Sequence, residues 1–224
     1  MILMKKRLIC FDLDNTLIES NKAHVTAFQM AFAKNKLKKV PAKKIEAMLN
    51  GRHAHAVVKL LFPDFNNGKI DKIVSDHHVF IIKTAKYARK IGDVIKTIKE
   101  IKRHYKVAIV TNCMHKEINA LLKATRLNKN LFDYIVGKED VRHGKPYPDE
   151  ILKAEHLARL KAYFMIGDSI YDIMAAKKAK VKSLSVLTGL AKRKELLKYK
   201  PDYVLGNVNE LMKLLNKIND KINK

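Results

Sequence analysis

Short apolar runs alternate with stretches of helical periodicity along most of this chain. Residues 7–11 form an apolar run that ends at Asp12, which predicts a buried strand. From Gly92 onward the alternation is regular, with strands expected over 106–110, 134–136, 162–166 and 183–187 and helices over about 94–101, 115–125, 149–158 and 171–179. Apolar strands separated by helices predict an α/β fold, a Rossmann-like parallel sheet covered by helices on both faces.

Residues 17–90 show a different pattern. Apolar residues recur at helical spacing, which predicts helices and no strand. Turn residues divide the segment into about four helices, and they are Pro41, Asn50-Gly51, Pro63 and Asn66-Asn67-Gly68. This segment interrupts the chain directly after the first strand. We therefore expect two domains, a core of residues 1–16 and 91–224 and an inserted all-helical domain of residues 17–90, with hinges near 17–20 and 89–92.

The composition is that of a globular protein. The 224 residues suffice for one sizeable domain or a core with a smaller insert, and a hydrophobic fraction of 47% excludes wholesale disorder. Two cysteines, Cys10 and Cys113, exclude a disulfide framework and a four-cysteine zinc site. Apolar runs fall far short of the ~20 residues that span a bilayer, and the first residues do not fit a signal peptide. We expect a cytoplasmic protein without a membrane partner.

The formal net charge of +24 would fit a nucleic-acid binder, a membrane-surface protein or an enzyme for anionic substrates. Of the 46 basic residues, 38 are Lys and eight are Arg. Proteins that recognise nucleic acids and phosphates instead depend on the forked guanidinium of Arg. Residues 17–90 hold 15 basic and five acidic residues, so the excess is shared with the rest of the chain. Dispersed Lys favours a composition bias, and no specific nucleic-acid partner is expected.

Polar side chains follow several of the predicted strands at the point where each strand ends. Active sites of open parallel sheets form beyond the carboxyl ends of the strands, so these side chains are expected to converge. A lysine in a loop ahead of a helix, within Gly144-Lys145-Pro146, belongs with them. In chain order, the candidate site residues are Asp12 and Asp14, Thr111 and Asn112, Lys145, Asp168 and Asp172.

The chemistry of this set points to a phosphoryl group. Asp12 and Asp14 are too close for both to ionise freely unless a cation lies between them or one of them is protonated. Clustered carboxylate oxygens suit Mg²⁺, and Asp168 and Asp172 would add further oxygens to such a metal site. A carboxylate nucleophile, an acid/base, a metal, a hydroxyl and the ammonium of Lys145 together form a site for phosphoryl transfer.

These residues resemble the four-motif signature of the haloacid dehalogenase superfamily: Phe11-Asp12-Leu13-Asp14-Asn15-Thr16-Leu17, Thr111-Asn112, Lys145-Pro146, and Gly167-Asp168-Ser169 with Asp172. A helical insert directly after the first motif is similar to the subgroup that contains phosphoglycolate phosphatase, pyrophosphatase and β-phosphoglucomutase. The resemblance covers nearly the whole chain, and four motifs in order are strongly specific. It implies a Mg²⁺-dependent phosphatase for a small phosphorylated metabolite, acting as a monomer or homodimer.

The resemblance also implies a role for each motif residue. Asp12 is the expected nucleophile, which forms an aspartyl-phosphate, and Asp14 the acid that protonates the leaving group and then activates water. Thr111 and Asn112 would bind the transferring phosphoryl group, and Lys145 would hold it against Asp12. The implied metal ligands are Asp12, the backbone carbonyl of Asp14, Asp168 and, as an outer or alternative ligand, Asp172. The superfamily's carbon–halogen dehalogenases usually lack the second aspartate, so Asp14 favours phosphoryl transfer.

The inserted domain is expected to act as a cap that closes over the mouth of the sheet. Arg52, at a helix break after Gly51, is a candidate for binding a second anionic group of the substrate. A second metal site is not expected at four of the insert's histidines, namely His53, His55, His77 and His78, because no Cys or Glu completes a ligand set there.

Three positions depart from the family's usual pattern. Asn15 replaces a more common Gly, Cys113 stands where phosphoglycolate phosphatases tend to have Lys, and Lys180 stands where an Ala-Gly pair usually ends a helix. The substrate therefore stays open. One alternative is a sugar phosphomutase with the same core chemistry. Another is a basic nucleic-acid-binding protein on a phosphatase fold, which would bind DNA or RNA with a steep salt dependence.

Overall fold

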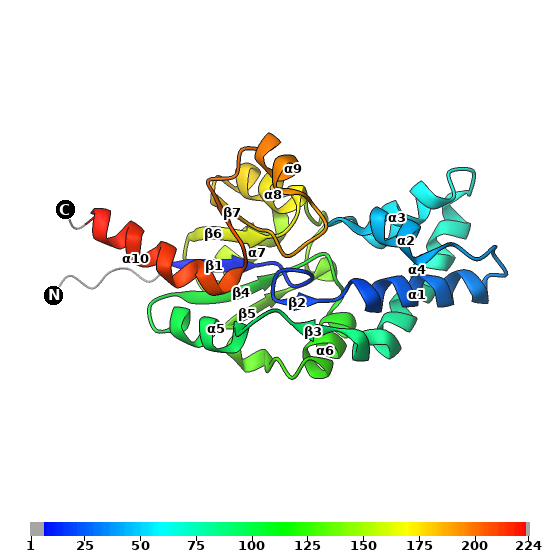
Figure 1. The fold of residues 1–224 in the computed structure, drawn as a ribbon, viewed down its shortest axis with the longest axis horizontal. Coiled ribbons are helices and arrows are strands. Elements are labelled where there is room, and N and C mark those ends of the chain that lie inside the picture. Colours follow the sequence, from blue (N-terminus) through cyan, green and yellow to red (C-terminus); the bar gives the residue numbers. More distant parts are fainter. Residues whose placement is uncertain (1–6, 223–224) are drawn as a thin grey trace.

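A six-stranded sheet forms the centre of the molecule in the computed structural model, which describes residues 7–222 (Figure 1). Its strands are β1 (Leu8–Phe11), β4 (Lys106–Val110), β5 (Tyr134–Val136), β6 (Ala162–Gly167), β7 (Lys182–Val186) and β8 (Tyr203–Leu205). They lie in the order β5-β4-β1-β6-β7-β8, and every neighbouring pair is parallel. The α/β fold class expected from the sequence is confirmed.

Helices cover both faces of this sheet. They are α5 (Val94–Lys102), α6 (His115–Ala124), α7 (Asp149–Ala158), α8 (Ile170–Ala179), α9 (Arg193–Lys198) and α10 (Leu211–Ile222). Successive strand residues point to opposite faces, so Ile9 and Phe11 of β1 pack with α5, α6 and α10, whereas Leu8 and Cys10 pack with α7 and α8. Burial on both faces explains why the central strand β1 is apolar throughout.

Four further helices lie beyond one end of the sheet (Figure 1). They are α1 (Asn21–Lys34), α2 (Ala42–Leu49), α3 (Ala54–Leu61) and α4 (Asn67–Thr84), which matches the four helices predicted in this segment. The four helices surround a hydrophobic cluster of their own, which includes Phe28, Phe32, Ile45, Val57 and Ile70. We refer to α1–α4 as the four-helix segment.

The prediction that residues 17–90 hold no strand was wrong. Two short strands, β2 (Ile18–Glu19) and β3 (Arg89–Lys90), pair antiparallel where the chain enters and leaves the four-helix segment. Two residues are too few to give a periodic signal, and the pairing joins positions far apart in the sequence. No helix or strand was expected after residue 187, so β8, α9 and α10 are additional to the predicted elements.

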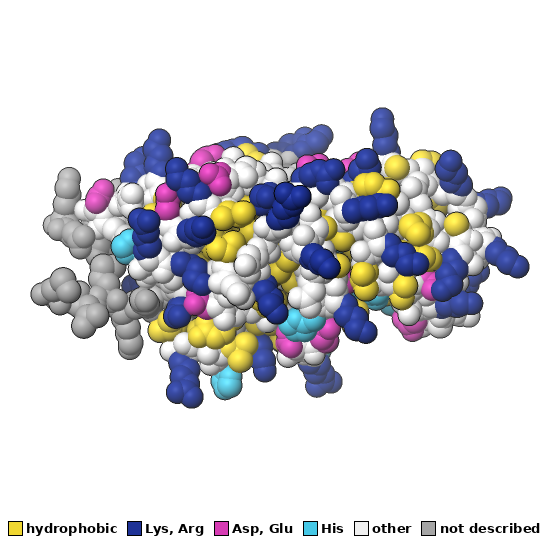
Figure 2. All heavy atoms as spheres, turned by 90° about the horizontal axis from the view of Figure 1, so that it is seen from below, with side chains coloured by type: hydrophobic (Ala, Val, Ile, Leu, Met, Phe, Trp, Pro, Cys, Tyr) yellow, Lys and Arg dark blue, Asp and Glu magenta, His cyan; other side chains and the backbone are white. Residues whose placement is uncertain are grey.

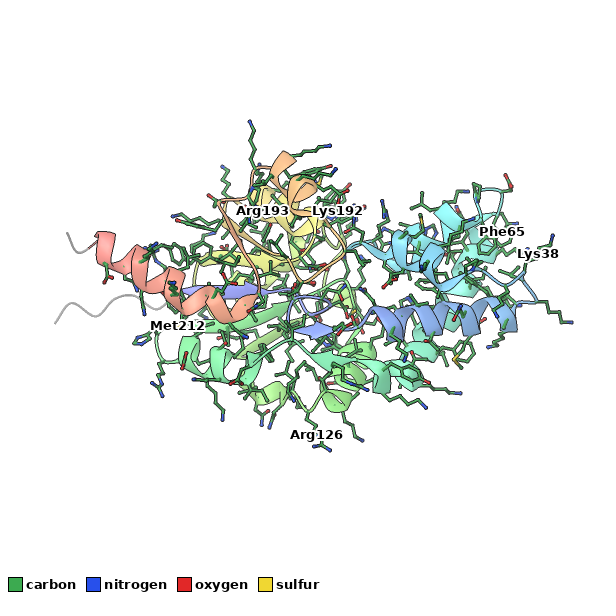
Figure 3. The ribbon with its side chains drawn as sticks, in the orientation of Figure 1. Lys38, Phe65, Arg126, Lys192, Arg193 and Met212 are labelled. Atoms are coloured by element: carbon green, nitrogen blue, oxygen red, sulfur yellow. The ribbon has the colours of Figure 1, made fainter. Side chains whose placement is uncertain are left out.

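Basic side chains are dispersed over the surface. Figure 2 shows Lys and Arg along the whole length of one face, without a single basic patch. The side chains of Lys38 and Arg126 are exposed and point outward from the four-helix segment and from the core, respectively (Figure 3). Within residues 7–222, the helices are too short or too polar to cross a membrane.

Candidate active site

The carboxyl ends of β4, β1 and β6 lie side by side, because these strands are neighbours in the sheet. Asp12 follows β1, Thr111 follows β4 and Asp168 follows β6, so the topology brings together residues that are up to 156 positions apart. A cleft runs between this end of the sheet and the four-helix segment. The predicted site residues that line this cleft are Asp12, Asp14, Arg52, Thr111, Asn112, Lys145 and Asp168. Asp172 does not line it and lies behind Lys145.

Lys145 forms two buried ion pairs. Its Nζ lies 2.6 Å from Asp12 Oδ1 and 2.7 Å from Asp172 Oδ1. Burial opposes the charge of Lys145, but the two carboxylates outweigh it and raise the pKa of its ammonium. Asp172 is held in turn, because its Oδ2 accepts hydrogen bonds from the backbone and hydroxyl of Ser169 at the start of α8. The sequence thus builds a capping motif that also aims Asp172 at Lys145.

Three buried carboxylates form an acidic cluster around this lysine. One ligating oxygen from each of Asp12, Asp168 and Asp172 lies within 4.8 Å of the others. Burial, reinforced by Asp12 and Asp172, raises the pKa of Asp168 well above its usual range. Burial also raises the pKa of Asp12, despite the opposing charge of Lys145. The ammonium of Lys145 therefore does not neutralise the cluster, and its all-oxygen donor set fits a hard divalent cation such as Mg²⁺.

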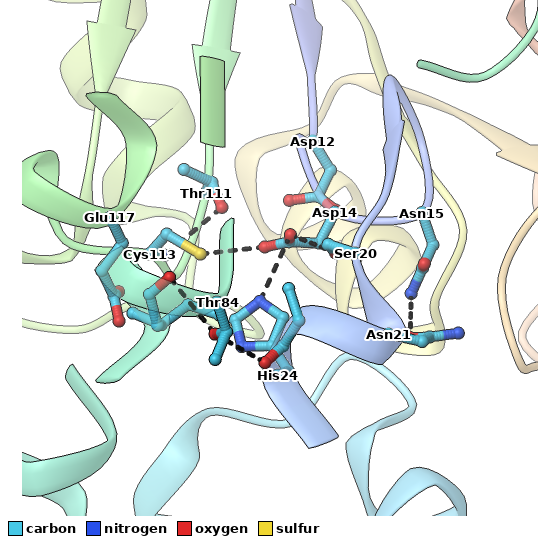
Figure 4. Close-up of polar contacts among 12 residues, drawn as sticks. Asp12, Asp14, Asn15, Ser20, Asn21, His24, Thr84, Thr111, Cys113 and Glu117 are labelled. Atoms are coloured by element: carbon cyan, nitrogen blue, oxygen red, sulfur yellow. Dashed lines mark hydrogen bonds and ion pairs between the residues drawn. The ribbon is translucent and has the colours of Figure 1, made fainter. Parts of the chain in front are cut away.

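Asp14 has a separate set of partners on the side of the cleft that faces the four-helix segment (Figure 4). Its Oδ1 accepts from Ser20 Oγ at 2.5 Å and lies 3.4 Å from His24 Nε2, and its Oδ2 accepts from Cys113 Sγ at 2.9 Å. Burial acts against ionisation, but the charge of His24 and these hydrogen bonds lower the pKa of Asp14 to about 2. Asp14 is therefore a carboxylate in this arrangement.

Thr111 and Asn112 hold the loops around Asp12. Asn112 Nδ2 donates to the backbone carbonyl of Lys145 at 3.1 Å, and Thr111 Oγ1 accepts from the backbone of Cys113 at 3.3 Å. Gly144 leaves room for this contact, because a Cβ there would overlap Asn112 Oδ1. The Lys145–Pro146 peptide bond is cis. Asn112 thus positions the loop of Lys145 in addition to lining the cleft.

The four-helix segment contributes Arg52 to the cleft from the loop between α2 and α3. Gly51 brings this loop against the core, since its φ is +73° and a Cβ there would lie 2.5 Å from Ser169 Cβ. Arg52 Nη1 donates to the carbonyl of Met48 at 3.2 Å, which ties the guanidinium to the end of α2. The predicted residue therefore lies in the same cleft as Asp12.

Two departures from the family pattern have local explanations. Asn15 has a φ of 54°, and Lys180 ends α8 with a φ of 58°. Glycine adopts this left-handed region most easily, and asparagine is the next most tolerant residue. Asn15 is therefore suited to the turn after β1, and Lys180 affects only the end of its helix.

Several residues near the site gave no signal in the sequence. Glu150, in the first turn of α7, is fully buried near Lys145 and neither of its carboxylate oxygens has a hydrogen-bond partner within the described chain. Burial raises its pKa to about 7, although Lys145 opposes this shift. In sequence it resembles any acidic residue of a first helical turn, so it gave no signal.

The histidines of α4 have partners that the sequence did not reveal. His77 Nε2 lies 3.3 Å from His24 Nδ1, and the buried carboxylate of Glu117 accepts from His78 Nδ1 at 2.8 Å. One ligand atom from each of His77, His78 and Glu117 lies within 4.8 Å of the other two, which is close enough for the three to share a metal ion. The expectation that no Cys or Glu completes a ligand set with these histidines was therefore wrong, because Glu117 reaches His77 and His78 from α6, 39 residues along the chain from His78.

Comparison with known proteins agrees with this architecture. A family model for haloacid dehalogenase-like hydrolases matches residues 9–186. Relatives named pyrophosphatase PpaX from Bacillus mycoides (strain KBAB4) and Bacillus thuringiensis (strain Al Hakam) are 29% and 28% identical, over 96% of this chain and 100% and 99% of theirs. Both alignments span the core and the four-helix segment.

Solved structures share the same fold. A haloacid dehalogenase-like hydrolase from Bacteroides fragilis superposes with a TM-score of 0.84 at 22% identity, covering 92% of this chain and 100% of its own. A structure described as a predicted phosphoglycolate phosphatase from Haemophilus somnus 129pt superposes with a TM-score of 0.81 at 21% identity, covering 95% and 99%.

The fold and the strand-end carboxylates define an α/β protein with an acidic cleft at the carboxyl edge of a parallel sheet, which is where enzymes of this class have their active sites. The chain belongs to the haloacid dehalogenase-like hydrolase family, whose model covers most of its length. Membership confirms the resemblance drawn from the four motifs and the enzyme class expected from them, a phosphohydrolase.

Proposed function

We propose that this enzyme is a Mg²⁺-dependent phosphatase that hydrolyses a small phosphomonoester through an aspartyl-phosphate on Asp12. The observation that supports this most is the buried cluster of Asp12, Asp168 and Asp172 around Lys145. One carboxylate oxygen of Asp12 is bound by Lys145, which orients the group at the floor of the cleft. A purely structural cluster would not need its charge to border an open cleft.

Each residue has a task that follows from its position. Asp12 attacks phosphorus, so that a bond forms between its carboxylate oxygen and the phosphoryl group as the ester oxygen leaves. Lys145 offsets the repulsion between the anionic ester and Asp12, and Thr111 and Asn112 are placed to donate hydrogen bonds to phosphoryl oxygens. Mg²⁺, held by Asp12 and Asp168 with the Asp14 carbonyl, would neutralise charge on the transferring group.

Asp14 exchanges protons on the other side of the phosphoryl group. Its low pKa keeps Asp14 ionised, so that its carboxylate is free to accept a proton, as the hydrolytic step requires. An anionic substrate beside it would raise that pKa, since a neighbouring negative charge disfavours ionisation. Asp14 would then hold the proton that the leaving oxygen needs, and after transfer it would take a proton from the attacking water.

The four-helix segment would serve as the cap of this site. It supplies His24 and Arg52 to the cleft, and the paired strands β2 and β3 mark the two chain crossings where hinges are expected. Arg52 would bind an anionic group on the non-reacting part of the substrate. Closure would exclude bulk water from Asp12. In this proposal residues 17–90 form the cap, and residues 1–16 and 91–224 form the core. Residues 1–6 and 223–224 lie outside the described structure.

A panel of phosphorylated compounds tests this function. Pyrophosphate and phosphoglycolate are included because relatives and structural neighbours bear those names. Phosphate release from p-nitrophenyl phosphate and from at least one metabolite, with Mg²⁺ and not with excess EDTA, is the expected result. Interconversion of glucose phosphates without phosphate release would identify a phosphomutase instead. Inactivity towards the whole panel, with tight salt-dependent binding of DNA or RNA, would favour the nucleic-acid alternative.

A further inference from the structure

Three different donor atoms meet beside the acidic cluster, at the boundary between the core and the four-helix segment. Asp14 follows β1, Cys113 follows β4 and His24 lies on α1 (Figure 4). Cys113 Sγ lies 2.9 Å from Asp14 Oδ2, and His24 Nε2 lies 3.4 Å from Asp14 Oδ1. One ligating atom from each of the three residues lies within 4.8 Å of the other two. These separations suit ligands that share one metal ion, with room for a water molecule from the cleft.

The donor set differs from that of the acidic cluster. A thiolate and an imidazole are soft ligands that Mg²⁺ avoids, whereas Zn²⁺ binds Cys, His and Asp together and keeps an open position in sites with three protein ligands. The three side chains are buried or partly buried, and Asp14, His24 and Cys113 all line the cleft. A metal ion could therefore reach them without opening the core.

His24 already has the second contact that a metal-binding histidine needs. Its Nδ1 lies 3.3 Å from His77 Nε2, and the two ring planes differ by only 15°. A neutral imidazole that holds its own proton on Nδ1 is an acceptor at Nε2, so His77 can accept the Nδ1 proton of His24. His77 is itself fixed by stacking on Phe28 at 4.0 Å. This contact directs His24 Nε2 at Asp14 and selects the tautomer that can bind a metal there.

We propose that Asp14, His24 and Cys113 form a regulatory binding site for a soft divalent cation of the Zn²⁺ type, distinct from the Mg²⁺ site at Asp12 and Asp168. Binding releases two protons to solvent, one from the thiol of Cys113 and one from Nε2 of the charged His24 ring, and involves no redox step. The bound ion coordinates the Asp14 carboxylate, which then cannot exchange protons with the substrate or water, and it links α1 to the end of β4. Occupation therefore holds the four-helix segment against the core and inhibits turnover. The inhibition rests on the proposed function, but the binding does not.

Cobalt(II) tests the binding directly, since a Co²⁺–thiolate bond gives a charge-transfer absorption that needs no enzyme activity. The full chain titrated with Co²⁺ should develop this band, and the Asp168→Asn variant should keep it because Asp168 is not a ligand. Cys113→Ser should abolish it. His77→Gln should weaken Co²⁺ affinity roughly 10- to 100-fold, as expected for the partner of a ligand. Cys10→Ser is the matched control, because Cys10 is buried in the core away from this cluster.

No thiolate band in the wild type, or a band that survives in Cys113→Ser, would overturn the site. The regulatory part is tested by Zn²⁺ inhibition at saturating Mg²⁺, with each variant normalised to its own rate without Zn²⁺. Cys113→Ser should need at least roughly tenfold more Zn²⁺ for half-inhibition than Cys10→Ser. Equal sensitivity would overturn the inhibitory role. Failure of the phosphatase proposal would appear separately, as an inactive wild type that still shows the cobalt band.

Discussion

Lys145 Nζ lies 2.6 Å from Asp12 Oδ1 although the two residues are 133 positions apart in sequence. The pair is buried at the floor of the cleft, and Asp172 contacts the same ammonium from the start of α8. Lys145 thereby orients Asp12 for attack, and its charge lowers the repulsion that an anionic substrate meets. The effect of removing this ammonium is consequently large and measurable.

Lys145→Met should lower kcat/KM for p-nitrophenyl phosphate by roughly 10²- to 10³-fold, as seen when one preorganised charge-stabilising donor is removed. Lys145→Arg should not restore the rate, because a planar guanidinium does not match the contacts of a compact ammonium. Steady-state kinetics measure both. Lys161→Met is the control, since Lys161 is exposed and pairs with Glu155 outside the cleft. Wild-type kinetics in Lys145→Met would contradict the assigned role.

Asp14→Asn should separate the two halves of the reaction. p-Nitrophenolate leaves without a proton, so the first step should survive, while hydrolysis of the aspartyl-phosphate should slow by roughly 10²- to 10⁴-fold without its base. Stopped-flow absorbance should show a burst of about one p-nitrophenolate per chain, followed by a slow phase. Alkyl phosphates, which need the acid, should show no burst. A steady state as fast as that of the wild type would exclude Asp14 as the acid/base.

Arg52→Ala should raise KM by roughly tenfold for substrates with a second anionic group and leave kcat nearly unchanged. This is the pattern of a contact made equally in ground and transition states. p-Nitrophenyl phosphate, which lacks a second anion, should be unaffected. The matched control is Arg126→Ala, because Arg126 is exposed on the core (Figure 3). Equal changes in KM for both types of substrate would show that Arg52 does not bind the second anionic group.

Glu150 should make the stability of the protein fall as pH rises. Its pKa is raised from an ordinary 4.5 to about 7, so the folded state binds the proton more tightly than the unfolded state. Its contribution is present below pH 4.5 and lost progressively up to about pH 7. The side chain of Glu150→Gln cannot ionise. The free energy of unfolding of this variant should therefore rise relative to that of the wild type across this pH range, by roughly 3 kcal/mol or less at its upper end.

Urea denaturation in EDTA at several pH values measures this difference. Exposed Glu19 provides the matched control, so the difference between Glu19→Gln and the wild type is measured over the same range, from pH 4.5 to 7, and compared with a constant offset. A constant offset for Glu150→Gln as well would mean that Glu150 is ionised with its ordinary pKa in the folded chain.

Much of the fold was readable from local patterns. β4 was expected over the residues it occupies, and α7 likewise, because apolar periodicity and flanking turns report burial directly. The pairing of β2 with β3 was not readable. Each strand is two residues long and gains its partner only when α1–α4 fold back on the core. Such a contact leaves no periodic trace in either segment.

The residues of the site likewise fall into those that the sequence identified and those that it did not. Asp12, Lys145 and Asp168 were identifiable because their residue types recur at strand ends in a specific order. Glu150 and Glu117 were not identifiable from the sequence. Each is a single acidic residue in a helical turn, and its role depends on which side chain lies next to it in the folded structure. Lys145 defines the environment of Glu150, and His78 defines that of Glu117. Long-range contacts of this kind exist only in the folded structure.

The central claim is that Asp12 is the nucleophile, and acid quenching during turnover of a ³²P-labelled phosphomonoester tests it most directly. Acyl phosphates survive acid and hydrolyse in alkali, so the label can be followed into peptides. With Mg²⁺ present, the wild type should yield an alkali-labile phosphate on the peptide that contains Asp12, and Asp12→Asn should yield neither label nor turnover. Wild-type turnover by Asp12→Asn, or a wild-type label on any other residue, would contradict the proposed mechanism.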